Sequence, residues 1–379
     1  MDETTSSAGC RRLAAQAPRT ATQTRVLRRV AAALACAVAA LGLAACGSGL
    51  GGSQPASAGP AGGNASGGSL GTVSIGKAVD TIGFTTVDVA MAKGYLAKEG
   101  IKATSTLLSG SSTAFAALQS GSVNFVTASS TALIAAKAKG LPLEAVASLD
   151  YGVSLQLLVA DKWSKAHGLA PGQPLNTVMN KLVGAKLGVL STTDLTYDHY
   201  LEQQAGVDQG KFTYVKIGSQ SAALAAIKFG EIDAFLLSPP STYYAQSQGG
   251  ATITASLHQV PELANMAYDI LVVDSNWAKS HAAEVKAVAT AIAMADDTMR
   301  TDPQSVLEVE KEHYPTMSQS VLLSSLKAVT FAPDGQFTAD QWSKALSEYK
   351  DTTKADVSGV DVSDSRGVWT NQYLPKSGQ

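Results

Sequence analysis

The chain has 379 residues, of which 45% are hydrophobic and 16% are charged, and its formal net charge is −2. This composition is too apolar for a disordered chain, and the length favours one bilobed protein or two to three domains. Six of the 29 basic and two of the 31 acidic residues precede Cys46, which leaves 23 basic residues against 29 acidic ones. This balance argues against a nucleic acid as partner, because the phosphate backbone requires a basic surface.

The first 45 residues have the pattern of an export signal. Arg25, Arg28 and Arg29 precede a 16-residue apolar run over 30–45, which is short for a membrane span and typical of a signal-peptide core. The run ends in Leu-Ala-Ala-Cys, which resembles the bacterial lipoprotein box. We therefore expect a signal peptide over 1–45 and a lipidated Cys46 that anchors an extracytoplasmic protein to the bacterial cell membrane. The alternative is an ordinary secretory signal.

The segment 46–70 is expected to be a flexible tether. In 47–70, 20 of 24 residues are Gly, Ser, Ala or Pro, and this composition cannot form a buried core. Cys10 and Cys36 would be lost with the signal, and no cysteine follows Cys46. The body of the protein therefore offers no cysteine nucleophile, no redox CxxC pair and no thiolate metal site.

From residue 71 onward, short apolar runs alternate with helical patterns. Val87, Ala90, Met91 and Tyr95 fall on one face of a helix. The alternation predicts a mostly parallel sheet with helices on both faces. The expected strands are 73–79, 101–108 and 123–128, and the other expected helices are 113–120 and 131–139.

One pattern recurs after about 109 residues. A Gly-Ser pair, at Gly110 and again at Gly218, opens a helix with an apolar Ala/Leu face. A second glycine, Gly121 or Gly230, closes that helix, and a strand follows. Two copies of one unit inside an α/β pattern predict two similar lobes.

The sequence thus predicts an α/β fold of two doubly wound lobes joined by two crossing strands. The extended runs 150–160 and 268–274 flank the second copy and are the expected crossings. Lobe I would comprise 71–154 and the return over 271–379, and lobe II would comprise 155–270. The helices expected in the return are 281–299, 303–313, 318–329 and 338–349, the last with Thr338 as its N-cap.

Hydroxyl-rich loops follow several predicted strands, at 109–113, 129–131, 191–194 and 238–240. Ligands of doubly wound sheets bind beyond the carboxyl ends of the strands, and N–H groups at helix N-termini bind oxyanions without a cationic side chain. Plain N-capping is the competing interpretation. Nearby acids could hold an amine, and nearby aromatic rings could stack on a flat ligand. These residues are Asp80, Asp150, Asp194, Asp198, Asp269, Phe84, Tyr151, Tyr197 and Tyr243.

Sequence patterns of catalysis are lacking. The five histidines show no HExxH or other paired metal spacing, and the sequence has no GxSxG, no Walker loop and no strand-linked GxGxxG. We therefore expect a protein that is not an enzyme, with no catalytic residue, no metal and no cofactor.

Four motifs, taken in order, resemble segments of the solute-binding proteins of nitrate/sulfonate/taurine-type ABC importers. They are Gly94-Tyr95-Leu96 with Glu99-Gly100-Ile101, Gly110-Ser111-Ser112 with 117–124, the strand 184–189, and 229–234 followed by Pro239-Pro240. Asn124 and Ala185 depart from the family pattern. The resemblance covers about 73–275. It implies the periplasmic-binding-protein type II fold, a small ligand between two lobes, an ABC permease with its ATPase as partners, and a monomer.

The resemblance also implies where the ligand binds: in the loop after the first strand, at the Gly-Ser helix start, at the next strand end and at the first helix start of lobe II. Relatives bind sulfonates, nitrate or pyrimidine precursors of thiamine. The hydroxyl-rich loops favour a sulfonate-, taurine- or nitrate-type anion, and a thiamine-pyrimidine-type heterocycle is the alternative. An enzyme on the same fold and a sensory or adhesive lipoprotein are further alternatives. The predicted ligand-binding residues are Asp80, Phe84, Thr85, Ser111, Ser112, Thr113, Ser129, Ser130, Thr131, Tyr151, Ser191, Thr192, Thr193, Asp194, Ser238 and Asp269.

Overall fold

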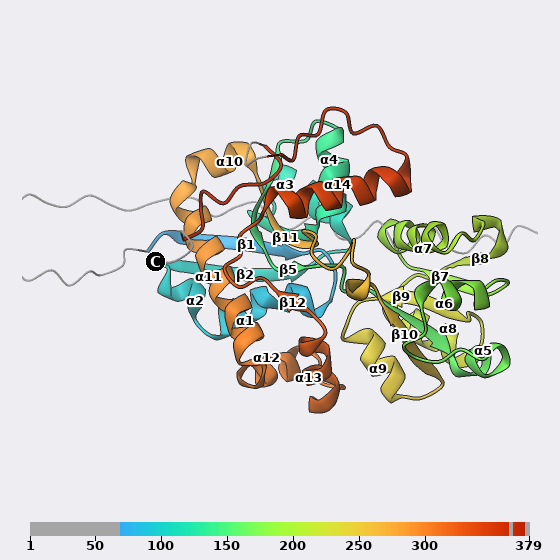
Figure 1. The fold of residues 1–379 in the computed structure, drawn as a ribbon. Helices are drawn as coiled ribbons and strands as arrows, with labels where there is room; N and C mark the ends of the chain where they lie inside the picture. The colour runs from blue at the N-terminus through green and yellow to red at the C-terminus, as the bar shows by residue number, and fades with distance from the viewer. Residues whose placement is uncertain (1–68, 364–366, 376–379) are drawn as a thin grey trace, which may run out of the picture. The chain divides into compact units, whose positions relative to one another are not determined.

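The computed structural model describes residues 69–363 and 367–375 (Figure 1). The expected signal peptide, the lipidated Cys46 and nearly all of the expected tether lie outside the described residues. Within these two ranges, none of the helices combines the length and the apolar character that crossing a membrane requires.

The first sheet has five strands in the order β2-β1-β3-β11-β4. β1 is parallel to β2 and β3, whereas β11 is antiparallel to both of its neighbours. β3 is buried along its whole length, as expected for a strand covered on both faces. The strands are β1 (Gly71–Lys77), β2 (Ile101–Leu107), β3 (Phe125–Ser129), β4 (Leu143–Ser148) and β11 (Asp269–Asp274).

Helices from both ends of the described chain pack around this sheet, and together they form lobe I (Figure 1). α14 begins as expected at Thr338, which forms a capping box with Gln341. The N-terminal group comprises η1 (Ile82–Thr85), α1 (Thr86–Ala92), α2 (Tyr95–Lys98), α3 (Ser111–Gln119) and α4 (Ser130–Ala138). The C-terminal group comprises α10 (Ser275–Ser280), α11 (Ala282–Thr301), η4 (Pro303–Val306), α12 (Leu307–His313), α13 (Gln319–Lys327) and α14 (Ala339–Thr353).

The second sheet, with its own helices, forms lobe II and has the order β10-β6-β9-β7-β8. Its strands are β6 (Gln156–Ala160), β7 (Lys186–Val189), β8 (Thr213–Lys216), β9 (Ala234–Leu237) and β10 (Ala251–Ser256). Its helices are α5 (Asp161–His167), α6 (Leu175–Lys181), α7 (Thr192–Ala205), η2 (Gln209–Lys211), α8 (Gln220–Phe229), α9 (Ser241–Ser247) and η3 (Leu257–Gln259).

The two sheets repeat one topology. Read from the β8 edge, the second sheet matches the first strand by strand: three parallel strands, then an antiparallel strand, then an edge strand antiparallel to it. The repeated sequence unit forms α3 and β3 in lobe I and α8 and β9 in lobe II. The closing glycines, Gly121 and Gly230, have φ of 72° and 74°, a conformation that favours glycine.

The chain crosses between the lobes twice. It leaves lobe I after β5 (Asp150–Tyr151), which pairs with β12 (Thr330–Phe331), and it returns through the segment 260–268. The two crossing segments are hydrogen-bonded to each other: the Gly152 N–H donates to the Met266 carbonyl at 2.9 Å. The expectation that 268–274 crosses was wrong, because Asp269–Asp274 is β11, an interior strand of the first sheet.

Candidate functional site

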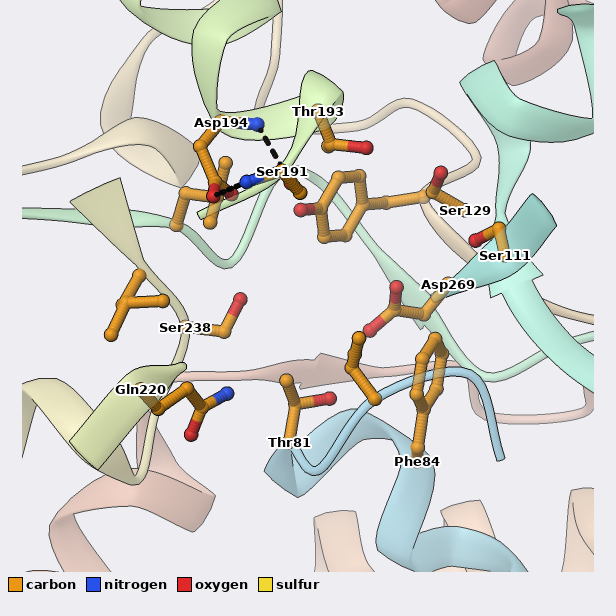
Figure 2. A pocket seen from close by; sticks show the side chains of 14 residues that line it. Thr81, Phe84, Ser111, Ser129, Ser191, Thr193, Asp194, Gln220, Ser238 and Asp269 are labelled. Atoms are coloured by element: carbon orange, nitrogen blue, oxygen red, sulfur yellow. Dashed lines mark hydrogen bonds between the residues drawn. The ribbon is translucent and has the colours of Figure 1, made fainter. Parts of the chain in front are cut away.

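A cavity opens between the lobes at the carboxyl ends of the parallel strands (Figure 2). The space free of protein atoms in and around it, open solvent included, is about 540 Å³. Lobe I and the crossing segments contribute Val79, Thr81, Phe84, Ser111, Ser129, Leu155, Tyr268 and Asp269. Lobe II contributes Ser191, Thr193, Asp194, Gln220, Leu237 and Ser238.

The start of α7 brings Asp194 to the cavity through a capping box. The Asp194 N–H donates to Ser191 Oγ at 3.2 Å, and Asp194 Oδ2 accepts from the N–H groups of Ser191, at 2.8 Å, and Leu190, at 3.1 Å (Figure 2). Burial raises the pKa of Asp194 to about 6, against the opposing effect of these hydrogen bonds. Three N–H groups at this helix start are therefore already bonded within the chain and are not free for an oxyanion.

The start of α4 is similarly occupied. Ser129 Oγ accepts from the Ala132 N–H at 3.3 Å, and the Ser130 N–H donates to the Tyr268 carbonyl at 2.8 Å. At this helix start, the hydroxyl of Ser129 thus acts as an N-cap. Its oxygen nevertheless lines the cavity and can still meet a ligand as a donor.

A pair of buried carboxyl groups forms one wall. Asp269, at the start of β11, lines the cavity, and Asp150 lies behind it, where Asp150 Oδ1 accepts from the Asp269 N–H at 2.9 Å. Burial raises the pKa of Asp150 to about 7. Burial, and next the charge of Asp150, raise the pKa of Asp269 well above its ordinary range. Two carboxylates that are this close together and shielded from water cannot both stay ionised without a cationic partner.

The ionisable side chains that carry charge at this cavity are acidic. Among the described residues that line the cavity there is no lysine, arginine or histidine, whereas Asp194 and Asp269 both reach it. Figure 2 shows the Asp269 side chain pointing into the cavity beside Phe84, with the Ser238 and Gln220 side chains on the lobe II side. A ligand here meets acceptors, hydroxyl groups and an aromatic ring, and no cation. In the described part of the chain, no group of three or more His, Cys, Asp or Glu side chains is arranged to hold a metal ion.

The structure brings eight of the predicted ligand-binding residues to the cavity. They are Phe84, Ser111, Ser129, Ser191, Thr193, Asp194, Ser238 and Asp269. Six of them lie in segments where the resemblance implies a ligand contact, whereas Ser238 and Asp269 were expected from the strand-end argument alone.

The other predicted residues do not line it, and most have partners elsewhere. Thr85 Oγ1 donates to Glu310 at 2.7 Å, Ser130 Oγ donates to the Ala267 carbonyl at 2.6 Å, and the Tyr151 hydroxyl donates to the Gln336 carbonyl at 2.6 Å. Asp80 bonds to His313 of α12 and to Tyr314, which directly follows it. Thr131 Oγ1 lies 3.3 Å from Ser129 Oγ, and Ser112 and Thr113 are exposed on α3. Thr192 begins α7, and its side chain is outside what the structure describes.

Sequence reasoning missed five lining residues, which are Val79, Leu155, Gln220, Leu237 and Tyr268. A sixth, Thr81, was not named singly but lies in the loop 80–85, where the resemblance implies a ligand contact. One of the five had a signal. Gln220 follows the second Gly-Ser pair, as Ser112 follows the first, so the repeat placed a helix start of lobe II at the same strand ends. The other four, Val79, Leu155, Leu237 and Tyr268, are apolar or lie in crossing segments, and nothing local in the sequence marks their orientation.

Comparison with known proteins identifies the family. A family model described as "NMT1/THI5 like" matches residues 81–306. No match was found among curated proteins.

Several solved structures share the fold. A protein from Bordetella bronchiseptica RB50 has a TM-score of 0.65 and 21% identity over 80% of this chain and 95% of its own. The periplasmic aliphatic sulphonate binding protein of Escherichia coli has a TM-score of 0.60 and 19% identity over 80% and 98%. The ligand-binding component of an ABC-type import system from Staphylococcus aureus has a TM-score of 0.60 and 16% identity over 74% and 91%. At these identities the likeness shows the fold, which is that of periplasmic binding proteins.

Proposed function

The chain belongs to the NMT1/THI5-like family, and from this premise we propose that it is the extracytoplasmic solute-binding component of an ABC importer. It captures a small solute between its lobes and delivers it to a permease driven by an ATPase. Binding stabilises the closed arrangement of the lobes, and the permease recognises that arrangement. Lipidation at Cys46 would keep the protein at the membrane surface, with the segment 46–70 as its tether.

The ligand class follows from the carboxyl pair of Asp150 and Asp269. We propose a small solute with an amine, an amino-heterocycle or another strong hydrogen-bond donor, because such a group supplies the partner that these buried acids require. Phe84 and Tyr268 offer faces to a flat ring. This reverses the preference drawn from the sequence, in which a sulfonate- or nitrate-type anion came first and a thiamine-pyrimidine-type heterocycle second.

An anion remains the second candidate because the starts of α3, α7 and α8 all reach the cavity through Ser111, Ser191 and Gln220. Helix N-termini favour negative charge. The anion would need the carboxyl groups in their neutral form, and Asp194 would compete with it for the N–H groups of α7.

Calorimetry on the wild type and on Asp269→Asn distinguishes the two candidates. The panel is taurine, ethanesulfonate, nitrate and 4-amino-5-hydroxymethyl-2-methylpyrimidine. If the donor-bearing pyrimidine binds, Asp269→Asn weakens it roughly 10- to 100-fold, because a charge-assisted hydrogen bond is lost. The matched control is Asp297→Asn, which removes an exposed carboxylate of α11 and leaves affinity unchanged. Binding of ethanesulfonate or nitrate that strengthens in Asp269→Asn would instead support the anion.

We propose that the protein performs no chemistry on its ligand. Among the described lining residues, the serine and threonine hydroxyls have no histidine beside them to serve as a general base. Mass spectrometry of the panel compound after incubation should therefore recover it unchanged, and a time-dependent new product would contradict the proposal.

A further inference from the structure

The loop that follows β1 lies between the cavity and α12. Its residues Val79 and Thr81 line the cavity, whereas the intervening Asp80 side chain meets α12. The Asp80 side chain therefore holds the loop from the side that faces α12. This residue was expected to touch ligand, and the structure gives it a different set of partners.

Two side chains at the end of α12 bind the Asp80 carboxylate. His313 Nε2 lies 2.7 Å from Asp80 Oδ1, and the Tyr314 hydroxyl donates to the same oxygen at 2.8 Å. Asp80 is 38% exposed and His313 27% exposed, so solvent screens the ion pair only in part. Tyr314 is buried, and its ring packs edge-on against the His313 ring.

The same loop also touches lobe II. Gln220 Nε2 donates to the Asp80 carbonyl at 3.3 Å, and the Ile82 N–H donates to the Pro239 carbonyl at 3.1 Å. Ser241 Oγ donates to Gln220 Oε1 at 2.7 Å and fixes the orientation of that amide. A continuous chain of hydrogen bonds thus runs from α12 through Asp80 to the helix start of α8.

We propose that His313 and Tyr314 are positioning residues: by holding Asp80, they set the loop 79–82 in the conformation that lines the cavity and bonds to lobe II, and they make the stability of this loop conformation depend on pH. The cavity role of the loop rests on the proposed function. The hydrogen bonds that connect α12 with lobe II are independent of that function. They can therefore be tested on the protein without a ligand.

The charges around His313 determine the sign of the pH dependence. Its hydrogen bond to Asp80 raises its pKa from the ordinary 6.5, against the opposing effects of burial and of Lys77. Asp88 also faces the ring, with Oδ2 3.9 Å from His313 Nδ1, and it is paired with Lys77. The stabilisation is therefore complete below the ordinary pKa of histidine and is lost as pH rises through the raised value.

Of the two further titratable acids next to His313, Asp80 stays charged and Glu310 titrates. Burial raises the pKa of Asp80, but the hydrogen bonds from His313 and Tyr314 outweigh it and bring the pKa below its usual value, so Asp80 stays ionised where His313 titrates. Burial raises the pKa of Glu310 to about 7. Glu310 is therefore a second group whose charge changes near neutral pH, and a Glu310→Gln variant is needed to separate its effect from that of His313.

Hydrogen exchange on the unliganded protein tests the proposal. The readout is the peptide that covers 79–86, followed from pH 5.5 to 8.5 and corrected for intrinsic exchange. We expect Tyr314→Phe and His313→Gln to speed its exchange at pH 6 roughly tenfold, since each removes a hydrogen bond to a charged group. In the wild type and in Glu310→Gln, exchange accelerates as pH rises past the His313 pKa. In the double variant with both His313→Gln and Glu310→Gln that acceleration is absent.

Two comparisons keep the test selective. The control is His258→Gln, in lobe II, where the ring bonds to Ser256 and should leave the 79–86 peptide unchanged. Asp80→Asn, which keeps an acceptor oxygen without the charge, should exchange at an intermediate rate with no dependence on His313. Exchange within twofold of wild type in both Tyr314→Phe and His313→Gln would overturn the proposal. So would equal acceleration in peptides throughout lobe I, which would indicate a merely structural role.

Discussion

The Asp269 N–H donates to Asp150 Oδ1 at 2.9 Å. The two buried carboxyl groups both lie next to Gly83. A Cβ on Gly83 would lie 2.5 Å from Asp269 Oδ2 and 3.2 Å from Asp150 Oδ2. The loop after β1 can approach the carboxyl pair this closely only because residue 83 has no side chain.

Gly83→Ala should therefore displace the Asp269 carboxyl group from the cavity wall. We expect at least about a tenfold loss of affinity for whichever panel compound binds and a loss of about 1–3 kcal/mol in the free energy of unfolding. Calorimetry and urea titration measure the two effects. The control is Gly210→Ala, where a Cβ would meet nothing within 4 Å. Unchanged affinity in Gly83→Ala would mean that the Asp269 carboxyl group does not contact the ligand.

Gln220 connects the lobes at the edge of the cavity. Gln220→Ala removes the donor to the Asp80 carbonyl and a polar lining group, so we expect affinity to fall roughly fivefold to tenfold. The exposed Gln248, at the end of α9, provides the control Gln248→Ala, with no change expected. Equal affinities of the two variants would show that the Gln220 bridge does not contribute to ligand binding.

The α7 and α14 helices pack across the lobes, and Glu348 of α14 is buried there. Burial raises the pKa of Glu348 to about 7, against a hydrogen bond from Thr352. The folded state then binds more protons than the unfolded chain between about pH 4.5 and pH 7, so stability falls as pH rises through this range.

Glu348→Gln should remove that contribution. At pH 5 the variant should unfold at the wild-type temperature, and at pH 8 it should be more stable by about 1–3 kcal/mol, because no buried charge forms. Thermal unfolding at the two pH values measures the difference. Glu308→Gln, on the exposed side of α12, should show no such pH-dependent gain. A Glu348→Gln curve parallel to wild type would mean that this carboxyl group ionises normally.

Thr338 caps the last helix. Its Oγ1 accepts from the Gln341 N–H at 3.3 Å, and Gln341 Oε1 accepts from the Thr338 N–H at 2.9 Å. Thr338→Ala should cost about 1 kcal/mol of stability in chemical denaturation. Ser347→Ala, in the exposed interior of the same helix, should stay within about 0.5 kcal/mol of wild type. If the two variants lose the same stability, the cap does not stabilise the helix.

Local patterns predicted much of the fold. Apolar periodicity and the closing glycines located the elements from β1 to α4, and the Thr338 signature located α14. These signals act over a few residues, and they coincide with the packing because the sheet is covered on both faces. The Gly-Ser repeat predicted the two helix starts that the cavity shares.

Contacts between residues far apart in the sequence could not be predicted from these local patterns. Asp150 and Asp269 are 119 residues apart, and Asp80 and His313 are 233 apart. The local sequence around an acid at a strand end is the same whether its side chain faces a ligand, another acid or a helix terminus. The sequence therefore indicated acids at the strand ends, but it could not tell that Asp269 lines the cavity while Asp80 bonds to the end of α12.

The position of β11 has a consequence for the order in which the molecule assembles. This strand lies between β3 and β4, yet it follows all of lobe II in the chain. During synthesis, which starts at the N-terminus, the edges of β3 and β4 therefore stay exposed until residue 274 has been added. Lobe II, by contrast, has all five of its strands once residue 256 has been added. The lobe that begins first is completed last, so a chain truncated before β11 would hold a finished second lobe beside an unpaired first one.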